Sequence, residues 1–67
     1  MRAAELDPQP RRLLRYIGRI DPNPTKIEPR NKAAAAELEE LGFGEIVPMF
    51  GGKFEGIQIT DAGRAAL

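Results

Sequence analysis

Apolar and basic residues alternate at helical spacing between residues 8 and 19, which predicts an amphipathic helix there. Leu13, Leu14, Ile17 and Ile20 fall on one side of such a helix. The opposite side carries a stripe of four arginines: Arg11, Arg12, Arg15 and Arg19. Asp7 and Pro8 favour a helix start at this point, because aspartate caps unpaired N–H groups and proline is tolerated in the first turn.

Residues 29–41 give the strongest helical pattern in the chain, since alanine, leucine and glutamate are good helix formers. Pro29 fits the first turn and Gly42 fits the stop. Ala34, Leu38 and Leu41 share one face, which we expect to be buried.

The connection between the two helices contains Pro22, Pro24 and Pro29, which exclude a long helix there. The pair Thr25 and Glu28 has the spacing of a capping box, which predicts either one helical turn there or the direct start of the next helix.

The stretch from residue 45 to 60 has strand-like alternation on both sides of a Gly-Gly pair and predicts a β-hairpin. Ile57 and Ile59 alternate with Gln58, which predicts one buried face. Pro48 cannot donate to a β-ladder, so its strand is expected at a sheet edge. Thr60 or Asp61 then caps a short terminal helix over residues 61–67.

Together these elements predict one small α+β domain over residues 1–67, ordered helix, short turn, helix, hairpin and short helix. A chain of this length buries only a small core. The four aromatic residues are expected to be core or half-core: Tyr16, Phe43, Phe50 and Phe54.

Charge is distributed unevenly along the chain, although the net charge is zero. Residues 1–32 hold eight basic and four acidic side chains, for a net charge of +4, and residues 33–67 hold two basic and six acidic ones, for −4. This asymmetry predicts either a polar partner or self-association, and the alternative is that the two halves pair with each other inside the fold.

Composition argues against several function classes. The chain has no cysteine and no histidine, so it lacks the commonest metal ligands and the commonest general base. Glu39 and Glu40 point about 100° apart on a helix and do not form a catalytic pair. We expect neither an enzyme nor a metal or cofactor site. The start of the chain lacks the apolar run of a signal peptide and no stretch has membrane-spanning length, so a cytoplasmic protein without membrane contact is expected.

Two segments resemble parts of the winged helix-turn-helix fold of small bacterial and phage regulators. "AAELEELGFGEIV" is similar to a recognition helix that continues into the first wing strand, and "GIQITDAGRAAL" to the second wing strand with the helix that follows. The resemblance implies a DNA-binding transcription regulator that uses a recognition helix over residues 30–41 and a wing at 51–54. The residues that it assigns to DNA contact are Thr25, Lys26, Arg30, Asn31, Lys32 and Lys53.

The chain departs from that family pattern in its second helix, which is reduced or absent, and in its low basicity. One copy with few basic residues would need a second copy for useful affinity, so a homodimer on double-stranded DNA is one expectation. The alternative is a protein-interaction module, such as a phage inhibitor or a complex subunit, that no longer binds DNA. Its partner would contact the arginine stripe or the acidic pair: Arg11, Arg12, Arg15, Arg19, Glu39 and Glu40.

Overall fold

Three α-helices and a three-stranded antiparallel sheet form a small winged-helix-like arrangement in the computed structural model, which describes residues 1–67. The helices are α1 (Pro8–Arg19), α2 (Lys32–Leu41) and α3 (Asp61–Ala66). The strands are β1 (Thr25–Lys26), β2 (Gly44–Met49) and β3 (Phe54–Ile59), and short 3-10 turns cover Ala3–Glu5, Pro29–Asn31 and Phe50–Gly52. The predicted α+β class is confirmed.

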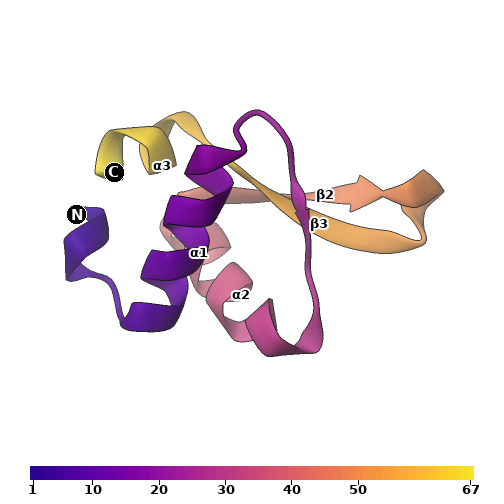
Figure 1. Ribbon diagram of the computed structural model, residues 1–67, viewed down its shortest axis with the longest axis horizontal. Helices are drawn as coiled ribbons and strands as arrows, with labels where there is room; N and C mark the ends of the chain where they lie inside the picture. Colours follow the sequence, from indigo (N-terminus) through magenta and orange to yellow (C-terminus); the bar gives the residue numbers. More distant parts are fainter.

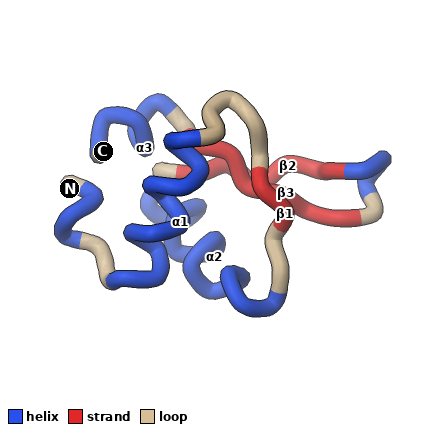
Figure 2. Tube along the Cα trace, viewed as in Figure 1, coloured by secondary structure: helices blue, strands red, loops and turns tan.

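The long β2–β3 hairpin projects from the helical body as a wing, shown in orange in Figure 1. β3 is the central strand, with β1 on one side and β2 on the other (Figure 2). Ile57 of β3 therefore pairs with Thr25 of β1 and with Ile46 of β2. The edge position predicted for the strand with Pro48 is confirmed.

β1 is a strand that the sequence did not predict. Thr25 and Lys26 pair with Ile57 and Gly56, and the amide of Ile27 donates to the carbonyl of Glu55 at 2.8 Å. The expected capping box of Thr25 and Glu28 is therefore wrong. Two residues after a proline carry too little alternation to reveal a strand, and the partner strand lies 30 positions later in the chain.

The core lies where α1 packs against β3 and α2 packs against α1 and β2. Leu14, Ile17, Leu38 and Ile57 are almost completely buried. The first turn adds Ala3 and Leu6, and the end of the chain adds Ala66. Complete burial of a leucine or isoleucine side chain contributes about 1.5–3 kcal/mol, so these few residues dominate the stability of so small a domain.

Two helix-level expectations need correction. Leu41 is 38% exposed, whereas Ala35 is buried in the core. Leu41 is the last residue of α2, and Phe43, which follows the helix, supplies the buried side chain at this end of the core. Asp7 does precede α1, but its side chain makes no capping hydrogen bond, and only its carbonyl accepts from the amide of Arg11 at 3.0 Å.

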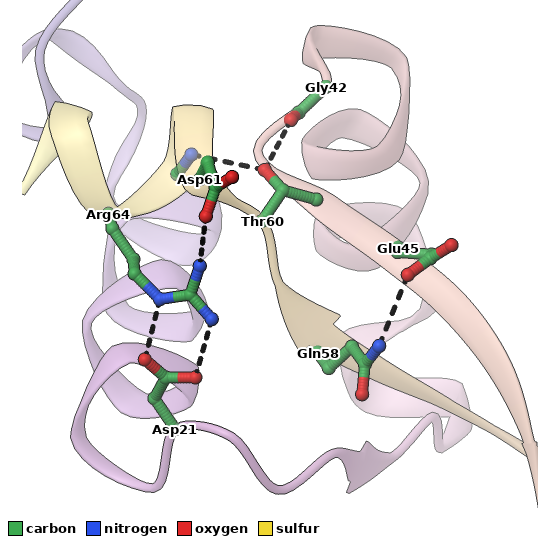
Figure 3. A network of polar contacts seen from close by, with 8 residues as sticks. Asp21, Gly42, Glu45, Gln58, Thr60, Asp61 and Arg64 are labelled. Atoms are coloured by element: carbon green, nitrogen blue, oxygen red, sulfur yellow. Dashed lines mark hydrogen bonds and ion pairs between the residues drawn. The ribbon is translucent and has the colours of Figure 1, made fainter.

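Helix α3 is fixed to the body at both ends of its first turn. The hydroxyl of Thr60 accepts from the amide of Gly63 at 3.1 Å and donates to the carbonyl of Gly42 at 2.6 Å (Figure 3). Arg64 forms a two-pronged ion pair with Asp21, at 2.6 and 2.8 Å, and contacts Asp61 at 2.6 Å. These contacts hold the turn after α1 against α3.

The same contacts hold the pKa of the Asp21 carboxyl below its usual value, chiefly through the hydrogen bonds from Arg64, whose own pKa is raised.

No helix of the structure combines the length and apolar character needed to cross a membrane.

We predict that Gly63→Ala destabilises the fold by about 1–3 kcal/mol, because a methyl group there would overlap the backbone carbonyl of Phe43. Gly18→Ala is the matched control. Its methyl would meet chiefly the flexible end of Leu67, so the variant should be neutral or more stable by up to about 1 kcal/mol. Urea denaturation measures both, and equal effects would contradict the packing of α3.

We predict that the Asp21–Arg64 contact makes stability depend on pH on the acid side. Because the folded pKa of Asp21 lies below the unfolded value of about 3.9, its contribution is present above that pH and is lost as pH falls through the folded value. Asp21→Asn should lower the melting temperature at neutral pH and flatten its decline in acid. Asp7→Asn, which removes a carboxylate without an ion pair, should retain the wild-type decline.

Candidate nucleic-acid interface

The segment between β1 and α2 is held by the side chain of Asn31. Its Oδ1 accepts from the amide of Glu28 at 2.7 Å, and its Nδ2 lies 3.4 Å from the carbonyl of Lys26. One 3-10 turn over Pro29–Asn31 thus takes the place of a second helix. Because its amide is already bonded at both ends, Asn31 orients the start of α2 and is poorly suited to reading a base.

The neighbours of Asn31 point outward. The side chain of Arg30 is 83% exposed, and its only ionic contact is Glu28 at 3.4 Å. Exposed pairs of this kind contribute about 0–1 kcal/mol and exchange readily for another partner. Lys32, the first residue of α2, is exposed and forms no ion pair.

A first groove, which we call the inner groove, lies between α1 and the β1–α2 connection and has a volume of about 610 Å³. It brings Arg12 of α1 together with Thr25, Arg30 and Asn31, three of the residues predicted to contact DNA. The remaining lining residues are Gln9, Leu13, Tyr16, Glu28 and Ala34.

A second groove of about 430 Å³, the wing groove, separates the start of α2 from the end of the hairpin. Lys32 and Lys53, which are 21 positions apart in the chain, both line it. The other lining residues are Ile27, Glu28, Pro29, Gly52, Phe54 and Glu55. The fold therefore places the predicted helix contact and the predicted wing contact on one groove.

The hairpin turns through Phe50, Gly51 and Gly52, whose φ angles are +52°, +68° and +89°. Lys53 follows them, and we call residues 50–53 the wing tip. Glycine tolerates positive φ, but phenylalanine does so at a cost.

Three aromatic residues contradict the expected core or half-core placement. Phe50, Tyr16 and Phe54 are 64%, 46% and 43% exposed, and only Phe43 is buried. The rings of Phe50 and Phe54 meet edge to face at 5.7 Å, and Nζ of Lys26 lies 3.8 Å from the centre of the Phe54 ring. Phe50 lies in the turn and Phe54 is the first residue of β3 after it. Their position next to the Gly-Gly pair was the signal that could have predicted their exposure.

The lysines around the wing groove and the wing tip form no ion pair within the fold. The structure contains three ion pairs, and none of them involves Lys26, Lys32 or Lys53. Glu28 and Glu55 are the carboxylates on the wing groove. No group of three or more acidic side chains is placed to hold a metal ion.

The opposite net charges of the two halves of the chain, +4 and −4, are not neutralised by ion pairs between the halves. Asp21–Arg64 is the one ion pair between them, and there the acid comes from the basic half. Arg12, Arg15 and Arg19 are exposed and Arg11 is half-buried, while Glu39 and Glu40 are exposed on α2. All six lack an ionic partner.

Comparisons with known proteins found no relative: no family model, no curated protein sequence and no solved structure matches this chain. The inference of function therefore rests on the resemblance seen in the sequence and on the geometry of the two grooves.

Proposed function

We propose that this protein is a small DNA-binding transcription regulator that places the start of α2 and the wing tip against one duplex. The observation that carries the proposal is the wing groove, where Lys32 and Lys53 face a common space without an ion pair. Phosphate contacts by such lysines supply most of the non-specific affinity of DNA-binding proteins.

The first turn of α2 is the part best suited to read bases. Arg30 stands just before the helix, exposed and weakly paired, and a guanidinium can form two hydrogen bonds to a guanine edge. Thr25 and Lys26 lie on the adjacent strand, where a hydroxyl and an ammonium suit phosphate oxygens. Asn31 supports this turn from behind rather than contacting DNA.

The acidic residues of α2 are compatible with this orientation. With a rise of about 1.5 Å per residue, Glu39 lies about 10 Å further along the helix axis than Lys32. A helix that enters the major groove by its N-terminal end keeps its last turns away from the bases. The carboxylates of Glu39 and Glu40 would then face solvent or a second protein.

A single copy offers few phosphate contacts, so the proposal includes a second copy on a neighbouring half-site. Two-fold dimers of helix-turn-helix proteins bind half-sites about one helical turn of DNA apart. The zero net charge of the chain makes such pairing more important, because long-range attraction to the duplex is weak.

We predict that the double variant Lys32→Ala, Lys53→Ala weakens duplex binding and reduces the slope of log affinity against log salt by about 2, because each lysine releases about one counterion. Fluorescence anisotropy with a labelled duplex between low and physiological salt measures both. Arg19→Ala, which removes an exposed cation outside both grooves, is the matched control and should keep the wild-type slope. A wild-type protein that binds no duplex at low salt would overturn the proposal.

A second candidate function, a protein-interaction module such as a phage inhibitor or complex subunit, is favoured by the unpaired charges away from the grooves. Arg15 and Arg19 on α1 and Glu39 and Glu40 on α2 are exposed without ionic partners. DNA binding through the grooves leaves these four side chains without a role.

For this second candidate, we predict that reversing the charge of Arg15 and Arg19, or of Glu39 and Glu40, abolishes capture of one specific protein from a lysate. Duplex affinity at physiological salt should change by no more than about twofold for Arg15→Glu with Arg19→Glu, because charges far from the contact are screened. Unaltered capture in both reversals would rule out these surfaces.

A further inference from the structure

Phe50 stands out because the fold holds its ring away from the core at a cost. It has a left-handed φ of +52°, a conformation that disfavours any residue with a Cβ atom. Its side chain is 64% exposed, and its stacking contact is the edge-to-face one with Phe54. A glycine would make the same turn without strain or apolar exposure, as Gly51 and Gly52 do next to it.

The ring of Phe50 is held in place by a neighbouring ring. Phe54 meets it at 87° between ring planes, and the ammonium of Lys26 lies over the ring of Phe54. Phe54 also lines the wing groove beside Lys32 and Lys53. The wing tip therefore carries the exposed ring of Phe50, which packs against Phe54, and lysine ammonium groups lie beside this pair of rings.

This combination matches the chemistry of a DNA base step. A phenylalanine ring can enter between two base pairs from the minor groove and unstack them partially, while nearby ammonium groups contact the flanking phosphates. The wing groove is lined by two lysines, Lys32 and Lys53, and by two carboxylates, Glu28 and Glu55. Lys26, over the ring of Phe54, adds a third ammonium group beside the wing tip, which favours a polyanion over an apolar pocket of a protein.

We propose that Phe50 is a wedge that the wing tip inserts between base pairs in the minor groove, which gives the protein a preference for easily unstacked steps. The inference rests on the proposed DNA-binding function and adds to it a source of specificity. TA and CA/TG steps unstack most readily, whereas A-tracts are stiff. The preferred duplex should therefore carry such a step where the wing lands.

The test uses two duplexes of equal length, one with a central TA step flanked by 2-aminopurine and one with a central A-tract. Wild-type protein should raise the 2-aminopurine fluorescence and bind the TA duplex more tightly than the A-tract. Phe50→Gly should lose the fluorescence change and weaken binding to the TA duplex about tenfold, the size expected for one lost base–aromatic contact. Phe50→Leu keeps an apolar wedge and should retain part of both effects.

Controls separate the wedge from folding and from charge. Phe50→Gly should unfold at the same or a higher temperature than wild type, because glycine relieves the positive φ. Its salt slope should equal that of wild type, because the ring carries no charge. Leu41→Ala, which trims an exposed apolar side chain at the far end of α2, should leave the fluorescence change intact.

Each outcome bears on the inference. A Phe50→Gly variant that keeps the wild-type fluorescence change and the preference for the TA duplex would overturn the wedge while leaving DNA binding in place. The same result is expected if the ring of Phe50 instead binds in an apolar pocket of another protein. A wild-type protein that binds neither duplex at low salt would overturn both the wedge and the proposed function.

Discussion

The burial of Ile57 in the cluster that joins the sheet to α1 and α2 is the constraint on which the rest of the structure depends. Ile57 lies in the central strand, is almost completely buried, and pairs with residues of both outer strands. Leu14 and Ile17 of α1 and Leu38 of α2 complete the fully buried set. With so few large side chains in the core, the sheet must meet the helices closely. The strands also pack closely against each other, since a methyl group at Gly44 of β2 would come within 2.6 Å of the Ile57 side chain in β3.

The short connection between α1 and α2 leaves the first residues of α2 exposed on the surface of the domain. A two-residue strand and one 3-10 turn replace a second helix, and the side chain of Asn31 fixes the turn by bonding to backbone on both sides. The first residues of α2 consequently face the wing across a groove rather than a supporting helix.

The wing contains residues that do not contribute to the core. Its distal residues include two exposed phenylalanines, of which Phe50 has a strained φ, and a lysine without an ion pair. None of these stabilises the helical body, and exposed apolar surface with backbone strain opposes folding. Strained and exposed apolar residues of this kind cluster at binding sites, which is the physical basis for proposing that the wing tip binds a ligand.

The sequence by itself determined the local elements, because their signals are local. Helical periodicity placed α1 at residues 8–19, Gly42 marked the end of α2, and alternation at Ile57 and Ile59 identified the buried face of β3. For α3 the sequence offered Thr60 or Asp61 as the cap, and the structure has Thr60. Only the tertiary structure decided the pairing of β1 with β3, the exposure of Leu41 and Phe50, and the meeting of Lys32 with Lys53 on one groove. These features depend on contacts between residues far apart in the chain, and periodicity within a single segment carries no information about them.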